Sequence, residues 1–343
     1  MLDVTVLFIV GIIIIALIFD FTNGFHDSAN AISTVISTKV LSPKNAVIFA
    51  AFFNFVAAFG FGVAVASTIS KIIRLDYVET SIIPYIVLSG LIGAITWNFI
   101  TWYFGLPTSS SHALIGGLMG GGLAAAGVAA IQFSTIGTIV LFMFLSPIIG
   151  LLMGLLFMTG VMRFSEDTPR HVADQRFRRL QLVSAAAYSF SHGTNDAQKT
   201  MGIITPLLFS IGYFGAGVDP NHLPVPIWVI LAAHAAIALG TLSGGWRIVK
   251  TMGYGITRLR PIHGFSAETA GAATIIGASI AGIPVSTTHI ISSSIMGVGA
   301  TQGVRAVKWG VARRIVTAWF ITIPLSALIG YLAFTLIRLV LGM

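Results

Sequence analysis

The stretch that decides the fold of this protein is residues 7–31, which read LFIVGIIIIALIFDFTNGFHDSANA. An apolar run from Leu7 to Phe19 passes directly into a segment of short polar residues that contains Asp20 and Asp27. A helix that crosses a bilayer needs about 20 mainly apolar residues, and an ionised side chain at its centre costs at least about 2.5 kcal/mol. The stretch therefore predicts a membrane span whose polar part faces a cavity or a partner.

The composition of the whole chain is typical of a membrane protein. Of 343 residues, 56% are hydrophobic and 9% are charged, whereas soluble domains have about 25% charged residues. Apolar stretches recur along nearly the whole sequence, so we expect one all-α, polytopic membrane unit. The N-terminus has no basic leader, and the first apolar segment is expected to be retained as a span. The absence of cysteine excludes disulfides and thiolate metal sites.

Two pairs of related segments occur in the same order along the chain. GFHD at 24–27 corresponds to GTND at 193–196, and GLPTSSSH at 105–112 corresponds to GIPVSTTH at 282–289. The aspartates of the first pair are 169 positions apart, and the prolines of the second pair are 177 positions apart. Such a nearly constant offset indicates an internal duplication.

The duplication divides the chain into residues 1–162, a polar linker at 163–179, and residues 180–343. Each half could hold about five or six spans, or about 10–12 in all. An odd number of spans per half would invert the second half, and loops rich in Lys and Arg usually face the cytoplasm. If the main basic clusters share that side, it holds 15 of the 19 Lys and Arg residues, which fits inverted-topology repeats best. These clusters are Lys39 with Lys44, the linker, 247–260 and 305–314. The net charge of +8 is therefore interpreted as a topology signal, and no nucleic acid is expected as a partner.

Four acidic residues fall within apolar surroundings, namely Asp20, Asp27, Asp196 and Glu268. Such residues usually face a cavity or a partner, although Asp20 could also reach the interface from a helix end.

The two aspartate motifs share a glycine three residues before the acid and a set of short polar neighbours, including Asn23 and Asn195. We predict a helix break at each motif, because such segments make poor continuous lipid-facing helices. Free backbone carbonyls, with carboxylate and amide oxygens, are the ligands that a small hard cation prefers. Lys199 is the only basic residue within either motif, and it could pair with Asp196 or attract an anion.

Three hydroxyls follow the proline in each copy of the second motif, at Ser109–Ser111 and at Ser286–Thr288. Proline with its neighbours predicts the start of a helix. The free N–H groups there and the positive end of the helix dipole favour an anion, to which hydroxyls can donate. Two such ends facing each other would surround an oxyanion. Serine and threonine could also simply cap these helices or pack between them.

Four histidines belong to the motifs. His192 lies in the second aspartate motif. His26 precedes the first aspartate, and His112 and His289 occupy equivalent places after the hydroxyls. We expect His112 and His289 to make hydrogen bonds that fix the motif rather than to act directly in catalysis. No H-E-x-x-H spacing of a metal site occurs.

At these residues the chain resembles the inorganic phosphate transporter (PiT) family of cation-coupled symporters. FTNGFHDSANA at 21–31 is similar to the family's first signature, and SHGTNDAQK at 191–199 is similar to its repeat. GGWR at 244–247, GFSAE at 264–268 and PVSTTH at 284–289 are also similar to bacterial and archaeal members. The resemblance covers essentially the whole chain.

This resemblance implies phosphate uptake with sodium or protons, an inverted-repeat fold with broken helices and hairpins, and a homodimer. It implies that the two hydroxyl motifs line the phosphate and that Glu268 matches a family carboxylate. The positions implied to hold cation and substrate are Asp27, Asn30, Asn195 and Asp196. Some members of the wider family move sulfate but lack these aspartates.

The predicted function is secondary active import of inorganic phosphate across the cell membrane, coupled to a cation, with sodium favoured over the proton and no covalent cofactor. Bound cations would neutralise Asp27 and Asp196 before phosphate arrives. A permease for sulfate or another oxyanion and an anion channel are alternatives. An enzyme is a further alternative: an intramembrane hydrolase could pair Ser109 with His112, or Ser286 with His289, at i,i+3 spacing. Neither segment carries a nearby carboxylate to orient the imidazole.

Overall fold

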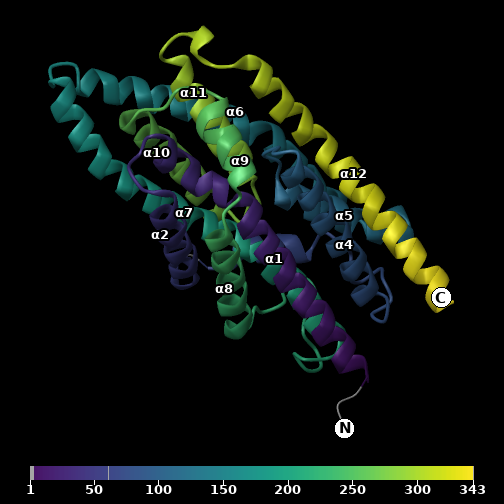
Figure 1. The fold of residues 1–343 in the computed structure, drawn as a ribbon. Coiled ribbons are helices and arrows are strands. Elements are labelled where there is room, and N and C mark those ends of the chain that lie inside the picture. Colours follow the sequence, from purple (N-terminus) through teal and green to yellow (C-terminus); the bar gives the residue numbers. More distant parts are fainter. Residues whose placement is uncertain (1–3, 61, 343) are drawn as a thin grey trace.

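The computed structural model describes residues 4–60 and 62–342, which form a bundle of long helices (Figure 1). These residues contain twelve α-helices, and the prediction of an all-α membrane protein is confirmed. The helices are α1 (Val4–Ser37), α2 (Pro43–Val56), α3 (Ala64–Ser70), α4 (Ile83–Tyr103), α5 (Ser110–Ala126), α6 (Phe133–Phe164), α7 (Arg170–Ser210), α8 (Ile227–Ser243), α9 (Trp246–Lys250), α10 (Pro261–Ile280), α11 (Thr287–Ala300) and α12 (Trp309–Leu341). Short 3-10 turns lie at Ala57–Phe59, Val128–Ala130 and Val304–Ala306, and a π-helical turn lies at Thr251–Gly255.

Four of the described helices are long and apolar enough to cross a membrane: α1, α4, α6 and α12. Two bent pairs could each supply one more span, α2 with α3 at 85° and α8 with α9 at 62°. This criterion gives up to six spans, fewer than the ten to twelve expected. The helices outside this count are either too short, as α5 and α11 are with 17 and 14 residues, or long enough but too polar, as α7 and α10 are with 41 and 20 residues.

The helix breaks do not lie at the aspartate motifs, where the sequence analysis predicted them. Helix α1 continues without interruption through Asp27, and α7 continues through Asp196. The prediction of a break at each aspartate motif is therefore wrong, and the bends lie instead within the two bent pairs.

The glycine shared by the aspartate motifs serves close helix packing rather than a break. A Cβ on Gly24 would lie 2.1 Å from the carbonyl oxygen of Ile237 in α8. A Cβ on Gly193 would lie 2.6 Å from the carbonyl oxygen of Asn54 in α2. Only glycine leaves room for a neighbouring backbone at these distances. Each motif helix therefore packs closely against α8 or α2.

The last helix of each half packs against the other half. Helix α12 lies along α5 and α4, and α6 lies along α11 and α10 (Figure 1). Small residues make both contacts close: a Cβ on Gly120 in α5 would lie 1.9 Å from the carbonyl oxygen of Ala327, and one on Gly297 in α11 would lie 2.1 Å from that of Leu151. The short helices that follow the hydroxyl motifs are thereby covered by long helices from the opposite half.

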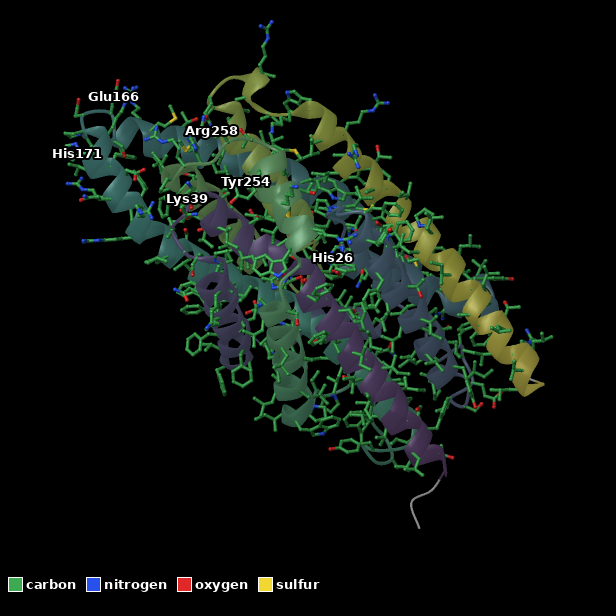
Figure 2. All side chains as sticks on the ribbon, in the orientation of Figure 1. His26, Lys39, Glu166, His171, Tyr254 and Arg258 are labelled. Atoms are coloured by element: carbon green, nitrogen blue, oxygen red, sulfur yellow. The ribbon has the colours of Figure 1, made fainter. Side chains whose placement is uncertain are left out.

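Segments from several basic clusters gather at one end of the bundle. Figure 2 shows Lys39, His171 and Arg258 toward the same end, with His26 near the middle. Hydrogen bonds join these segments, since Arg178 donates to the carbonyl oxygen of Lys39 at 2.5 Å, and Lys308 donates to that of Tyr254 at 3.2 Å.

Candidate functional site

The two motif aspartates meet in the interior of the bundle. One carboxylate oxygen each from Asp27 and Asp196, together with one ring nitrogen of His192, lie within 4.8 Å of one another. All three residues are buried. Asp27 comes from α1 and Asp196 from α7, so the two duplicated aspartate motifs form one centre.

The Asp27 carboxylate is held by residues from two further helices. Nδ1 of His26 lies 2.8 Å from Oδ1 of Asp27, and Nε2 of the same ring lies 3.1 Å from the hydroxyl of Thr101 in α4. The hydroxyl of Ser110, the first residue of α5, donates to the same Oδ1 at 3.3 Å. The positive end of the α5 dipole therefore faces this acid.

The Asp196 carboxylate has a corresponding arrangement. The hydroxyl of Thr287, the first residue of α11, donates to Oδ2 at 3.3 Å. Nε2 of His192 lies 3.3 Å from the same oxygen without forming a hydrogen bond, and Nδ1 of that ring lies 3.2 Å from Oδ1 of Asn54 in α2. Each aspartate thus faces the N-terminus of a short helix and has a histidine beside it.

Lys199 joins the second aspartate to the first hydroxyl motif. Its ammonium donates to Oδ1 of Asp196, to the hydroxyl of Ser111 and to the carbonyl oxygen of Val285. The side chain is 1% exposed. Of the two roles considered from the sequence, the structure shows the pairing with Asp196, and all three ammonium protons are engaged.

The predicted helix starts at the hydroxyl motifs are confirmed. Ser109 is the N-cap of α5, and its side chain accepts the backbone N–H of His112 at 3.2 Å. Ser286 is the N-cap of α11 and accepts the backbone N–H of His289 at 3.1 Å. These two hydroxyls therefore cap helices, whereas Ser110, Ser111 and Thr287 contact the charged groups at the centre.

Asn30 extends the polar centre toward the second hydroxyl motif. Its amide donates to the hydroxyl of Thr288 at 2.9 Å, and its Oδ1 has no hydrogen-bond partner. Tyr188 donates to the carbonyl oxygen of Thr287 at 3.1 Å. Asn23 lies one turn before Asp27 on α1, and its Oδ1 is also buried without a hydrogen-bond partner.

Two other predicted cation ligands contact α7 or α10 residues. The amide of Asn195 donates to Ser279 of α10 at 2.9 Å. Glu268 accepts from Gln181 at 3.0 Å and from Ser184 at 2.5 Å. Ser184 precedes Asp196 by twelve residues, which is about 18 Å along a helix, so the Glu268 cluster is separate from the aspartates.

His112 and His289 pack ring against ring. Their centroids are 4.8 Å apart, and His289 also stacks on Trp319 at 3.9 Å. Nδ1 of His112 and both ring nitrogens of His289 have no hydrogen-bond partner. The rings therefore fix the contact between α5 and α11 through packing.

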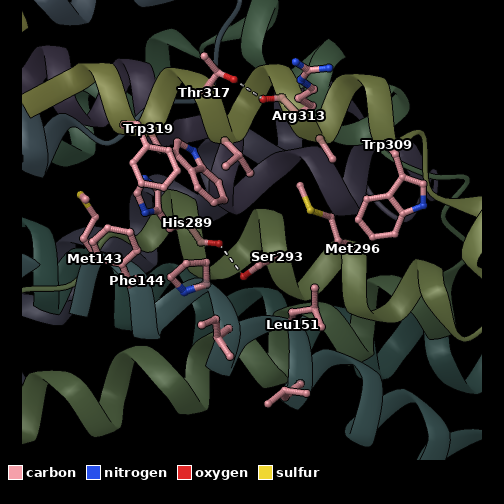
Figure 3. Close-up of a pocket in the computed structure, with 16 residues that line it drawn as sticks. Met143, Phe144, Leu151, His289, Ser293, Met296, Trp309, Arg313, Thr317 and Trp319 are labelled. Carbon is pink, nitrogen blue, oxygen red and sulfur yellow. Dashed lines mark hydrogen bonds between the residues drawn. The ribbon is translucent and has the colours of Figure 1, made fainter. Parts of the chain in front are cut away.

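An apolar cavity lies away from the acidic centre. It measures about 770 Å³, lies between α6, α11 and α12, and is almost entirely apolar. Figure 3 shows His289 beside Trp319 on its wall, with Trp309 and Arg313 farther along. Because a small oxyanion needs several polar donors, this cavity does not suit phosphate.

Sequence reasoning missed several polar partners of the predicted site residues. Thr101 holds His26, Asn54 holds His192, and Gln181 with Ser184 holds Glu268. The spacing of Gln181, Ser184, Tyr188 and Asn195 along α7 follows a single helical face and was the available signal. The remaining partners lie far away in sequence and carry no local signal.

The serine–histidine pairs required for a hydrolase are not formed. The hydroxyls of Ser109 and Ser286 accept backbone N–H groups rather than pairing with the imidazoles three residues later. Two carboxylates that face two helix N-termini inside an apolar bundle are instead an arrangement typical of a membrane transporter.

Comparison with known proteins identifies the kind of transporter. The model of the phosphate transporter family matches residues 23–330, and the chain belongs to this family. A "Probable low-affinity inorganic phosphate transporter" of Rhizobium meliloti (strain 1021) is 52% identical over 341 residues, covering 97% of this chain and 98% of that protein. A protein with the same description from Bacillus subtilis (strain 168) is 45% identical and covers 99% of this chain and 100% of its own length. A solved structure described as "The sodium-dependent phosphate transporter" superposes with a TM-score of 0.87 at 26% identity, covering 97% of this chain and 99% of that chain.

Proposed function

We propose that this protein imports inorganic phosphate across the cell membrane together with a cation, and that the cation is sodium rather than the proton. The observation that carries the proposal is the meeting of Asp27 and Asp196 at the N-termini of α5 and α11. The carboxylates suit a cation, and the helix ends with their hydroxyls suit an oxyanion. The sodium dependence named for the similar solved structure favours sodium.

The charges at the centre explain why uptake would need a cation. Asp27 and Asp196 together carry two negative charges when ionised, and Lys199 balances one of them. Phosphate itself carries between one and two negative charges near neutral pH. Bound cations would cancel the remaining charge, so that phosphate can approach the helix ends without facing an uncompensated carboxylate.

The proposed phosphate ligands are the hydroxyls and amide that already face this centre. They are Ser110, Ser111, Thr287, Thr288 and Asn30, with Lys199 as the fixed positive charge. Ser109 and Ser286 contribute by holding the two helix ends. Asp27 and Asp196 are the proposed cation ligands at this centre, whereas Glu268 and Asn195 make two other polar contacts between α7 and α10.

We also propose that the halves 1–162 and 180–343 lie in the membrane in opposite orientations and that the basic end of the bundle faces the cytoplasm. The reciprocal packing of α6 and α12 and the gathering of Lys39 and Arg258 at one end support this topology. By family resemblance, the working unit is a homodimer.

The test is radiolabelled phosphate uptake into proteoliposomes under sodium and proton gradients imposed separately. We expect accumulation with an inward sodium gradient and little with a proton gradient alone. Excess unlabelled sulfate should leave this uptake unchanged. Uptake that responds only to the proton gradient would show that the coupling ion is the proton. Cation-independent flux would indicate a channel.

A further inference from the structure

Asp20 is a buried carboxylate that the site described above does not use. It lies within α1, is 0% exposed, and neither of its oxygens has a hydrogen-bond partner. This burial excludes the helix-end position considered from the sequence. A buried ionised carboxylate without a partner is strongly unfavourable, so Asp20 can be ionised only with a bound positive charge beside it.

The groups around Asp20 offer oxygens. Asn23 from α1 and Thr200 from α7 face its carboxylate, although neither reaches hydrogen-bond geometry with it. Oδ1 of Asn23 and the hydroxyl oxygen of Thr200 are themselves buried without partners. The charged groups that act on Asp20 are Asp196 and Lys199. The Lys199 ammonium is already engaged by Asp196, Ser111 and Val285.

We propose that Asp20, Asn23 and Thr200 form a binding site for a small monovalent cation, separate from the one at Asp27 and Asp196. Carboxylate, amide and hydroxyl oxygens without thiolate or free imidazole are the ligand set of a hard cation such as sodium. This inference deepens the proposed function and rests on it.

The site draws residues from both halves but has no counterpart at the equivalent positions of the repeat. The positions 169 residues after Asp20 and Asn23 are Ser189 and His192, and the position 169 residues before Thr200 is Ala31. The repeat therefore carries no carboxylate at this place. The two halves therefore differ at this position, because only the first half supplies a carboxylate.

The location of the site links it to the aspartate centre. Asp20, Asn23 and Asp27 follow one face of α1 at i, i+3 and i+7, and Asp20 lies about 10 Å from Asp27 along the helix. On α7, Thr200 is the neighbour of Lys199. A cation at Asp20 would remove a negative charge close to Asp196 before phosphate binds.

The test is equilibrium binding of radiolabelled sodium to the purified full-length protein in lipid nanodiscs without phosphate. Asp20→Asn should bind one sodium ion fewer per chain than the wild type. Thr200→Val, which keeps the side-chain shape but removes one oxygen, should keep the number of sites and weaken one of them about tenfold. Thr205→Val is the matched control, because that hydroxyl only donates to the carbonyl oxygen of Met201 within α7.

The two proposals fail in different ways. An unchanged number of sodium sites in Asp20→Asn would overturn the Asp20 site, even if the wild type imports phosphate with sodium. If Asp20→Asn does not fold, an unchanged sodium affinity in Thr200→Val overturns the site instead. Absence of sodium-driven phosphate uptake by the wild type in proteoliposomes would overturn the proposed function.

Discussion

Lys199 and Asp196 form a buried ion pair one helical turn apart on α7, with the ammonium 2.5 Å from Oδ1 of the carboxylate. The equivalent carboxylate of the first half, Asp27, has a histidine and a serine hydroxyl as partners instead. The two duplicated acids therefore have different charged surroundings, because only Asp196 is paired with a lysine.

Replacing this lysine should make the protein depend on sodium for its stability. In Lys199→Gln, Asp196 loses its ionic partner, and breaking a buried pair costs about 3–5 kcal/mol. We expect a lower melting temperature in choline chloride and a larger recovery in sodium chloride than for the wild type. Thermal unfolding in both salts measures this, with the exposed Lys44→Gln as control. Equal sodium responses of variant and wild type would contradict the idea that a cation can replace the ammonium.

The two central aspartates should be indispensable for uptake. Asp27→Asn and Asp196→Asn are each expected to abolish cation-dependent phosphate uptake, because the amide cannot hold a cation by charge, while the protein remains in the membrane. Asp76→Asn is the control, since this exposed acid pairs only with Arg74 in a loop, at 3.2 Å. Undiminished uptake by either central variant would remove that aspartate from the mechanism.

The hydroxyls at the two helix ends should affect phosphate affinity more than the maximal rate. Ser110→Ala and Thr287→Val each remove one donor, which should raise the KM for phosphate about tenfold. Ser89→Ala is a suitable control, because Ser89 is buried but donates only to the carbonyl oxygen of Ile86. Initial uptake rates over a range of phosphate concentrations separate KM from the maximal rate. A KM equal to that of the wild type would assign these hydroxyls to helix packing.

The motif glycines should be intolerant of even one methyl group. Gly24→Ala and Gly193→Ala place a Cβ 2.1 Å and 2.6 Å from a neighbouring backbone oxygen, and we expect a loss of about 1–3 kcal/mol from overpacking. Gly11→Ala in the same helix as Gly24 meets nothing within 4 Å and should be neutral or stabilising by up to about 1 kcal/mol. Thermal unfolding of the three variants tests this. Equal melting temperatures would show that α8 and α2 can move away without cost.

Features set by local chemistry could be predicted from the sequence. The starts of α5 and α11 follow from proline and a capping serine, which act within one turn. The burial of Asp27 and Asp196 follows from acids placed in apolar segments and repeated at a constant offset.

Features set by contacts between distant segments could not be predicted. The continuity of α1 through Gly24 depends on the backbone of α8, which is more than two hundred residues away in sequence. The separation of Glu268 from Asp196 depends on where α10 crosses the long helix α7. The hydrogen-bond partners of Ser110, Ser111 and Thr287 likewise depend on how α1, α5, α7 and α11 cross.

The crossing of α6 and α12 into opposite halves has a consequence for how the chain assembles. A fragment containing residues 1–162 would lack the helix that covers α5, and a fragment containing residues 180–343 would lack the helix that covers α11. Neither fragment could bury its own glycine-lined surface. A protein cut at the linker would recover its structure only when both pieces are present, because each piece completes the fold of the other.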